Sequence, residues 1–205
     1  MAVNTKAETK AQTKSQKVQE SRSRILQAAS ELFLDGGMAA LSVRAISKRA
    51  GLSTIGIYSH FDGKQGILDA LYIEGFERVA EAMDVPPDNH SPKQRVLAST
   101  RAYLEVADKY RAHYRLIFGE VDEGYQPSAA AQEVAERAFG KLIRGVGGVL
   151  PESATLSEKQ ALALEVWAIV HGYVGLKNHA VAHAVQNVDW NEAALAAVNT
   201  RLNAL

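Results

Sequence analysis

Residues 41–61, LSVRAISKRAGLSTIGIYSHF, decide the fold. Two short segments with apolar residues at helical spacing lie on either side of Gly51, and a serine precedes each segment. Ser42 and Ser53 are suited to cap helices, because a serine hydroxyl accepts a hydrogen bond from a backbone N–H in the first turn. The apolar positions are Val43, Ile46, Ala50, Leu52, Ile57 and Phe61. This spacing predicts a helix-turn-helix, in which the first short helix holds the second.

The second of these helices is expected from about Thr54 to His60. In a helix-turn-helix this is the element that enters the major groove of DNA. Because the helix is short, only side chains near its N-terminus reach base edges, and these belong to Thr54, Ile55 and Gly56. Glycine costs a helix about 1 kcal/mol relative to alanine. Its presence at position 56 is consistent with a helix that approaches DNA closely.

Helical spacing continues on both sides of this stretch. Upstream, a helix from about Ser21 to Gly36-Gly37 has one apolar face, made of Ile25, Ala29, Leu32 and Phe33. Downstream, Asp62 followed by Gln65 has the spacing of a capping box. It predicts a fourth helix that reaches about Asp84.

The rear of the chain is helical as well. Capping-box spacing occurs three times, at Ser91/Gln94 with Pro92 between them, at Ser157/Gln160 and at Asp189/Glu192. Further helices are predicted over residues 92–109, 111–119, 127–149, 158–184 and 190–203. No stretch alternates with period two between turn signals, so we expect an all-α fold of about nine helices.

Three regions are expected along the chain. Residues 1–19 have almost nothing to bury and predict a disordered arm. Residues 20–70 form the helix-turn-helix domain, and residues 71–205 form a helical domain for ligand binding and dimerisation. The arm is basic, since it contains Lys6, Lys10, Lys14 and Lys17. Two interpretations of the arm stay open: added phosphate or minor-groove contacts, or an inert tail.

The charge is unevenly distributed although the formal net charge is zero. Residues 1–70 contain ten Lys and Arg against six Asp and Glu, and residues 71–205 contain thirteen against seventeen. A basic front suits a protein that presents one end to a polyanion. The chain has no cysteine, which excludes disulfides and thiolate chemistry. It has neither a long apolar run nor a secretory signal pattern, so we expect a cytoplasmic protein without membrane association.

The run from Ser23 to about Leu71 resembles the DNA-binding domain of TetR-family regulators. The matching features are the Gly36-Gly37 helix end, Ser-Val-Arg-x-Ile at 42–46, Gly-Leu-Ser at 51–53, and Ile57-Tyr58-x-His60-Phe61 with Lys64 and Leu68. The sequence departs from the family at Gln65-Gly66, where the family usually continues with an acidic, strongly helical segment. Further along, Trp167-x-x-x-His171-Gly172 resembles the C-terminal domain of one TetR subgroup.

The resemblance sharpens the prediction of DNA-binding residues. It places Arg44 near the groove, and it makes the polar side chains around the two helix starts phosphate donors. The predicted set is Ser42, Arg44, Ser53, Thr54, Ile55, Gly56, Tyr58, Ser59, His60 and Lys64. Other interpretations stay open for single residues. Tyr58 and His60 could pack against the first helix, Arg44, Lys48 and Arg49 could be a solvated face, and Lys64 could be an ordinary surface residue.

For the rear domain the resemblance implies ligand binding and dimerisation. Candidate pocket residues are Tyr103, Tyr110, His113, Tyr114, Phe118, Phe139, Trp167 and His171, each of which could instead be a core or interface residue. The last two helices, with small residues such as Gly172 and Gly175, are the expected dimer interface, the alternative being packing within one chain. His179 and His183 have the four-residue spacing of a metal pair, but no carboxylate completes a motif, so no metal or cofactor is expected.

The expected function is a dimeric, sequence-specific DNA-binding regulator: a repressor released from a palindromic operator by an unidentified small-molecule effector. One recognition helix buries too little surface for operator affinity, and two copies one helical turn apart bind a pseudo-palindrome. The alternatives are a small all-helical enzyme or carrier and an interaction protein without DNA-binding activity. We expect no enzyme, because the sequence has no nucleophile motif and no metal cluster.

Overall fold

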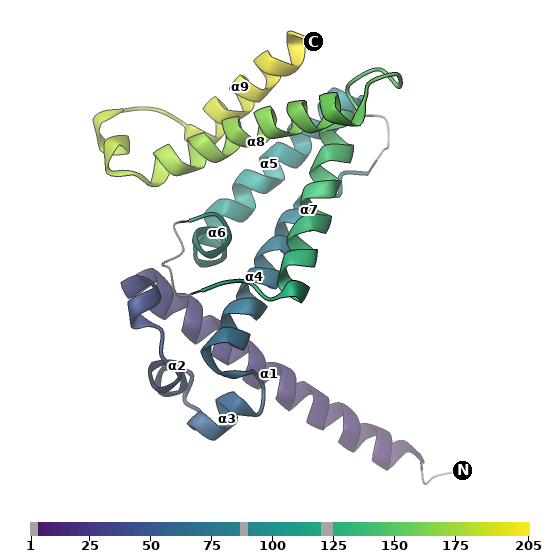
Figure 1. Cartoon of the computed structure of the whole chain (residues 1–205). Helices are drawn as coiled ribbons and strands as arrows, with labels where there is room; N and C mark the ends of the chain where they lie inside the picture. The colour runs from purple at the N-terminus through teal and green to yellow at the C-terminus, as the bar shows by residue number, and fades with distance from the viewer. Residues whose placement is uncertain (1–3, 87–89, 120–124) are drawn as a thin grey trace. The chain divides into compact units, whose positions relative to one another are not determined.

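The computed structural model of the chain describes residues 4–86, 90–119 and 125–205, with side chains from Ser15 onward except that of Val181. Every regular element in these ranges is a helix (Figure 1). The elements are α1 (Asn4–Gly36), η1 (Gly37–Ala40), α2 (Val43–Ala50), α3 (Thr54–Tyr58), α4 (Gly63–Ala82), α5 (Pro92–Lys109), α6 (Arg111–Phe118), α7 (Ala129–Gly147), α8 (Leu156–Asn178), η2 (Ala180–Ala184) and α9 (Trp190–Asn203). The predicted all-α class, with an N-terminal helix-turn-helix, is confirmed.

The helices form two compact units. Met1–Glu74 and Arg115–Ala131 make up the first, and Gly75–Tyr114 and Gln132–Leu205 make up the second. Helices α4, α6 and α7 therefore contribute residues to both units.

Isoleucines from the three N-terminal helices form the core of the first unit. Ile25 of α1, Ile46 of α2 and Ile57 of α3 are all completely buried. Ile67 and Leu68 of α4 close the same core. Burying an isoleucine side chain stabilises a fold by about 1.5–3 kcal/mol, so these contacts hold the two short helices in place.

A later segment of the chain is bonded to α4 within the first unit. The carboxylate of Asp69 accepts hydrogen bonds from the Tyr125 hydroxyl at 2.9 Å and from the Ser128 backbone N–H at 3.2 Å. The Tyr125 ring also meets Tyr72 edge-on, with the ring centroids 6.1 Å apart. Burial raises the pKa of Tyr125, and its bond to Asp69 raises this pKa further. These contacts attach the start of α7 to the middle of α4.

Helix α1 corrects the prediction of a disordered arm over residues 1–19. The helix begins at Asn4, and only residues 1–3 of the arm lie outside the described part of the chain. Its N-terminal half is rich in Ala, Lys, Gln and Glu and contains neither Gly nor Pro, so intrinsic propensity favours a helix. The side chains of residues 15–20 are exposed, and burial therefore plays no part in shaping them.

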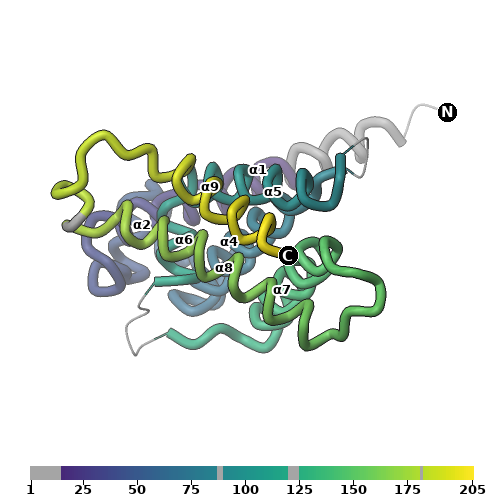
Figure 2. The backbone as a smooth tube through the Cα atoms, turned by 90° about the horizontal axis from the view of Figure 1, so that it is seen from above, coloured from purple at the N-terminus to yellow at the C-terminus, as the bar shows by residue number. Residues whose placement is uncertain are grey.

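In the second unit α5, α8 and α9 pack against one another (Figure 2). One side of α8 is buried through Leu162, Val166, Val170 and Val174. Val198 and Leu202 of α9 pack into the same core. Because α8 is also largely apolar on its outer side, its sequence has almost no helical amphipathicity to mark which face is buried.

Two predicted features of α8 are wrong. The helix starts at Leu156, because Thr155 is the N-cap and forms a capping box with Glu158, in place of the predicted pair Ser157 and Gln160. The helix ends at Asn178 rather than near residue 184, and the 3₁₀ turn η2 follows. Helix α7 is also shorter than predicted, Ala129–Gly147 instead of 127–149. Within the described residues no helix is long and apolar enough to span a bilayer.

Candidate nucleic-acid interface

Two side-chain caps set the direction of the helix-turn-helix. The Ser42 hydroxyl accepts from the Ala45 backbone N–H at 3.1 Å, and the Ser53 hydroxyl accepts from the Gly56 N–H at 3.0 Å. Gly51 ends α2 with φ at 65°, in the left-handed region where glycine carries no Cβ penalty. Both predicted N-caps are confirmed. The free N–H groups and the positive end of the dipole at each helix start favour a negatively charged partner.

Helix α3 has one buried side and one exposed side. Ile57 points into the core with no exposed surface, whereas Ile55 is 79% exposed and Tyr58 is 63% exposed. Ser53, Thr54 and Ser59 are exposed too. The high exposure of Tyr58 disfavours the alternative interpretation, in which this residue packs against the first helix.

Two glycines shape the surface around α3. Gly63 has φ at +59°, and a Cβ on it would come within 3.3 Å of Cε1 of Tyr58. The Tyr58 ring thus lies against the Gly63 backbone, which limits the ring's freedom while leaving it exposed. A Cβ on Gly56 would come within 3.4 Å of the Ser53 hydroxyl oxygen. Gly56 thereby leaves room for the Ser53 cap, a local reason for glycine that adds to the predicted close approach to DNA.

Two arginines of α1, which the sequence analysis did not select, hold the carbonyl ends of the short helices. Arg24 donates to the Ala50 carbonyl at 2.5 Å and to the Gly51 carbonyl at 3.3 Å. Arg22 donates to the His60 carbonyl at 2.6 Å, and its guanidinium lies 4.3 Å from the centroid of the Phe61 ring. Both bonds bring a cation to carbonyls at a helix C-terminus, where it is stabilising. No sequence signal reveals this role, because the acceptors are backbone atoms that lie 26 to 38 residues away.

The cations of α2 separate into two kinds. Arg44 and Lys48 are exposed. Arg49 is bound within the unit, to Glu31 at 3.0 Å and to Asp35 at 3.3 Å, and these carboxylates raise its pKa. Arg49 is exposed too, but it has acidic partners of its own, so Arg44 and Lys48 are the cations of this helix that we expect to meet a polyanion.

The last two predicted phosphate donors are half-buried. The Lys64 ammonium donates to the Met38 carbonyl at 3.1 Å, which uses one of its three N–H groups. His60 is half-buried, and its carbonyl is the acceptor for Arg22. Of the predicted set, the exposed members are Ser42, Arg44, Ser53, Thr54, Ile55, Tyr58 and Ser59.

In the second unit, five of the eight predicted pocket residues form one aromatic cluster. They are Tyr103, Tyr114, Phe139, Trp167 and His171. The Tyr114 hydroxyl oxygen lies 2.7 Å from Nδ1 of His171, and the Tyr103 hydroxyl donates to that of Tyr114 at 3.4 Å. Burial raises the pKa of Tyr103 to about 12, raises that of Tyr114, and lowers that of His171. At neutral pH the cluster is therefore uncharged.

The other three predicted pocket residues are Tyr110, His113 and Phe118. Tyr110 and His113 meet edge-on with centroids 5.9 Å apart, and the Arg78 guanidinium lies 3.9 Å from the Tyr110 ring centroid. Phe118 belongs to the first unit. A groove of about 340 Å³ is separate from the cluster and is lined by residues that include Pro151, Ala161, Glu165, Arg201 and Leu205.

The outer side of α8 presents small and apolar side chains. Leu164 is 48% exposed and Leu176 is 49% exposed, and Ala161, Ala168 and Gly172 are exposed between and beside them. A Cβ on Gly172 or Gly175 would meet no atom within 4 Å. This exposed α8 face is the surface that the sequence analysis expects to pair with a second copy.

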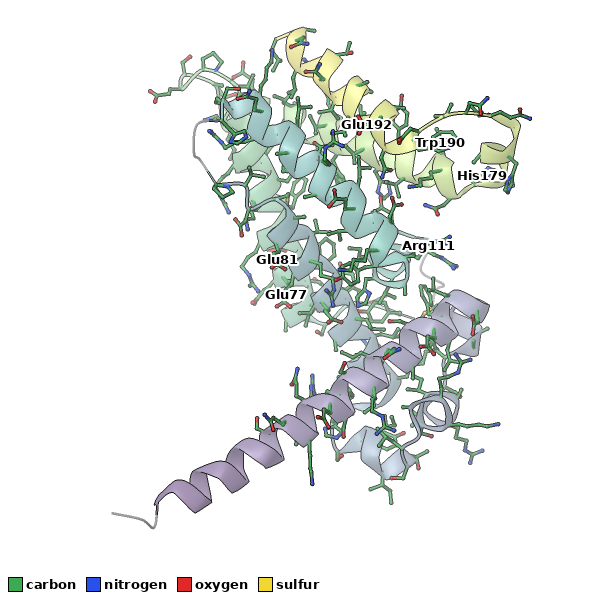
Figure 3. The ribbon with its side chains drawn as sticks, turned by 180° about the vertical axis from the view of Figure 1, so that it is seen from behind. Glu77, Glu81, Arg111, His179, Trp190 and Glu192 are labelled. Atoms are coloured by element: carbon green, nitrogen blue, oxygen red, sulfur yellow. The ribbon has the colours of Figure 1, made fainter. Side chains whose placement is uncertain are left out.

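The four-residue spacing of His179 and His183 is not a spacing along one α-helix. Figure 3 shows His179 at the end of α8 and Trp190 at the start of α9. His179 has extended backbone and His183 belongs to η2, so the two histidines do not share a face of one α-helix. Among the residues with described side chains, no group of three His, Asp or Glu is placed to hold a metal.

Comparison with protein families matches both halves of the chain. Residues 25–71 match the model of the tetR family of bacterial regulatory proteins. Residues 96–198, half of the chain, match the model of the tetracyclin repressor-like C-terminal domain. The family resemblance identified in the sequence is confirmed.

A curated relative is the HTH-type transcriptional activator FasR of Mycolicibacterium smegmatis, which is 35% identical over 121 residues. That match covers 55% of this chain and 52% of FasR, so the chain spans about half the length of the curated relatives it matches.

Solved structures share the fold. A Rhodococcus sp. RHA1 protein of unknown function superposes with a TM-score of 0.72 at 24% identity, covering 90% of this chain and 95% of that one. The TetR-family regulator PfmR of Thermus thermophilus superposes with a TM-score of 0.66 at 18% identity, covering 88% of this chain and 97% of that one.

Proposed function

The chain belongs to the tetR family of bacterial regulatory proteins, and we propose that it regulates transcription by binding duplex DNA through the exposed side of α3. One observation carries this proposal. Helix α3 buries Ile57 completely and leaves Thr54, Ile55 and Tyr58 at the surface, next to the capped starts of α2 and α3. Base edges would be read by Thr54, Ile55 and Arg44, and phosphates would be bound by the exposed hydroxyls. Such a role places the protein in the cytoplasm.

We propose that the DNA-binding form is a homodimer paired through α8 and α9. The exposed α8 face, with Leu164, Leu176 and Gly172, supports this proposal, because small residues allow a second helix to approach closely. Two copies of α3 would then meet two half-sites about one helical turn apart on the same face of the duplex. Sedimentation of the protein and the symmetry of a selected DNA site both test the pairing.

The aromatic cluster of the second unit is the proposed effector site. Its side chains are uncharged, and its polar atoms are hydroxyls, an indole N–H and a neutral imidazole. A small, neutral, mainly apolar molecule with one or two hydrogen-bonding groups is therefore the expected ligand.

Helix α6 supplies a route from this site to the DNA-binding unit. Tyr114 of α6 contacts His171 in the second unit, and the next residue, Arg115, lies 5.3 Å from the ring centroid of Phe33 in the first. A ligand that displaced Tyr114 would thus move a helix that also packs in the first unit, and would change DNA affinity by its unequal affinity for the two states.

The sequence predicts a repressor that its ligand releases, whereas the relative FasR is named an activator. We propose that the occupancy of DNA by this protein depends on a ligand, which is compatible with repression and with activation. Transcription in vitro from a template that carries the selected site would distinguish repression from activation.

Selection from a random duplex library, using the whole chain, tests DNA binding. We expect an enriched inverted repeat, and a Kd for it that rises steeply with salt. Arg44→Ala should weaken binding about tenfold or more, because a bidentate Arg–guanine contact is worth about 1–3 kcal/mol. Arg49→Ala is the matched control, since it removes the same charge from the same helix but from an arginine bound to Glu31 and Asp35.

Each result of this experiment has one meaning. A selected site bound equally by the parent and by Arg44→Ala would contradict the assignment of Arg44. Failure of the parent to enrich any sequence would contradict the proposed function. If Arg49→Ala weakened binding as much as Arg44→Ala, net charge and not position would explain the effect.

A further inference from the structure

Two side chains of α4 bind the segment of chain that leads into α7. The Gln65 amide donates to the Gln126 backbone carbonyl at 2.8 Å and to the Asp69 carboxylate at 3.3 Å. Asp69 in turn accepts from the Tyr125 hydroxyl and from the Ser128 N–H. We call these four hydrogen bonds the α4 clasp. All of the residues in the α4 clasp belong to the first unit.

Gln65 is the residue at which the sequence departs from the TetR family, and its amide explains why a glutamine suits this position. An amide can donate to a carbonyl and to a carboxylate at the same time. A carboxylate at position 65 could not donate to the Gln126 carbonyl. It would also repel Asp69, which lies four residues later on the same side of the helix. The α4 clasp therefore depends on the residue types that this chain has at positions 65 and 69.

The first two turns of α4 pack directly against the end of α3. Ile67 and Leu68 are almost completely buried, in the same core as Ile57. Gly66 lies against Phe61, since a Cβ on this glycine would come within 3.5 Å of the Phe61 carbonyl carbon. The Phe61 N–H donates to the Ile57 carbonyl at 3.0 Å. A displacement of the first two turns of α4 would therefore displace the end of α3 as well.

Beyond the clasp, α7 continues as one helix from the first unit into the second. The Ser128 hydroxyl accepts from the Ala131 N–H at 3.3 Å and so caps the first turn of α7. About 16 Å further along the helix, at about 1.5 Å per residue, is Phe139. The Phe139 ring centroid lies 5.7 Å from that of Trp167, in the aromatic cluster. Helix α7 thus joins the α4 clasp to the proposed effector site.

We propose that the α4 clasp couples the effector site to α3, with Gln65 and Asp69 as positioning residues for DNA binding. This inference rests on the proposed function and names a further route for its regulation. Helices and hydrogen-bond networks carry coupling between distant sites when they move as units. A ligand that displaces Phe139 would displace α7, and the clasp would pass this movement to the start of α4. The route through α6 is separate, because Arg115 of α6 contacts Phe33 of α1.

Asp69 offers two variants that remove the same charge and differ in hydrogen bonding. Asp69→Ala removes the acceptor of the bonds from Gln65, Tyr125 and Ser128. Asp69→Asn keeps a side-chain oxygen that can accept these bonds. Gln65→Glu breaks the clasp from its other side chain, and because Gln65 is exposed this variant should keep the fold.

The experiment uses DNA in place of the unidentified effector. Coupling is reciprocal, so DNA binding must act on α7 as strongly as α7 acts on DNA binding. Hydrogen exchange is measured for the full-length parent and the three variants, each with and without a saturating amount of the duplex that the parent selects. In the parent and in Asp69→Asn we expect the duplex to change exchange of the α7 amides at 132–139 by about fivefold or more. In Asp69→Ala and Gln65→Glu we expect the duplex to leave these amides unchanged.

This readout separates positioning from stability. A loss of stability alone would raise exchange in the free and the bound protein alike, and the change caused by the duplex would remain. The inference would be overturned if Asp69→Ala and Gln65→Glu showed the same change as the parent, or if the parent showed none. It would also be overturned if Asp69→Asn behaved like Asp69→Ala, because charge and not hydrogen bonding would then be responsible. If the parent selects no duplex at all, the proposed function fails first, so the two failures are distinguishable.

Discussion

Tyr58 in the first unit and Tyr114 in the second are the same residue type in opposite situations. Tyr58 is 63% exposed on the rim of α3, and Tyr114 is largely buried with its hydroxyl 2.7 Å from Nδ1 of His171. A hydroxyl at the surface is available to a partner without cost to the fold. A hydroxyl already bonded in a core contributes to stability, and it can respond to a ligand only by changing that bond. The two tyrosines thus differ in how they present a hydroxyl: Tyr58 displays it at the surface, and Tyr114 bonds it internally.

The largest expected effect is the difference in stability between alanine variants of two isoleucines that are two positions apart in the sequence. Ile57→Ala should destabilise the protein by about 2–5 kcal/mol, because it empties a fully buried position in the core. Ile55→Ala, at a side chain that is 79% exposed, should change stability by less than about 0.5 kcal/mol. Urea unfolding measures both, and DNA binding by folded Ile55→Ala should still be weakened. Equal destabilisation by the two variants would show that α3 is packed differently.

The next largest effect is expected when the hydroxyl group is removed from each of the two tyrosines in turn. Tyr114→Phe should cost about 1–3 kcal/mol of stability, since it removes the hydroxyl bonded to His171 in a buried site. Tyr58→Phe should leave the unfolding midpoint nearly unchanged and weaken DNA binding. If Tyr58→Phe destabilised the chain as much as Tyr114→Phe, the division between displayed and bonded hydroxyls would be wrong.

Helix caps in the two units provide a smaller, matched comparison. Ser53→Ala and Thr155→Ala each remove a side chain that caps a helix, and each should cost about 1 kcal/mol of stability. Only Ser53→Ala should also reduce DNA affinity, since Ser53 caps α3. A loss of DNA affinity in Thr155→Ala at a temperature where it is fully folded would contradict this separation.

The smallest effect expected is a pH dependence from His171. Burial lowers the pKa of this imidazole in the folded state below its ordinary value of 6.5. The unfolded chain therefore binds a proton first as the pH falls, and stability should decrease as the pH drops through 6.5 toward the folded-state pKa. Urea unfolding on either side of this window should show the decrease in the parent and a weaker one in His171→Gln. An identical pH profile in the two proteins would contradict the assignment to His171.

The sequence was most informative where its signals are local. Ser42 and Ser53 cap their helices as predicted, and Gly51 ends α2, because caps and left-handed glycines act within a few residues. The same signals were ambiguous at α8. Thr155/Glu158 and Ser157/Gln160 have equal spacing, and the true cap could not be chosen without the backbone.

Contacts between residues far apart in the chain could not be predicted from the sequence. The bonds of Arg22 and Arg24 end on backbone carbonyls, and Asp69 binds Tyr125, which is 56 residues away. Residue type suggested that eight residues form one pocket, and five of them form the aromatic cluster of the second unit. It could not assign Phe118 to the first unit. The predicted helix is shorter than α1, because the N-terminal half of α1 has almost nothing to bury and therefore lacks the periodic apolar face that marks a helix in a sequence.

The most direct test of the central claim is the base preference of α3. The random-duplex selection is repeated with a variant that carries both Thr54→Ala and Ile55→Ala, two exposed changes that should leave the fold intact. We predict the same inverted repeat with the same half-site spacing, but with preference lost at one or two positions in each half-site. A motif identical to that of the parent at every position would contradict the account, because the exposed side of α3 would then not be reading DNA.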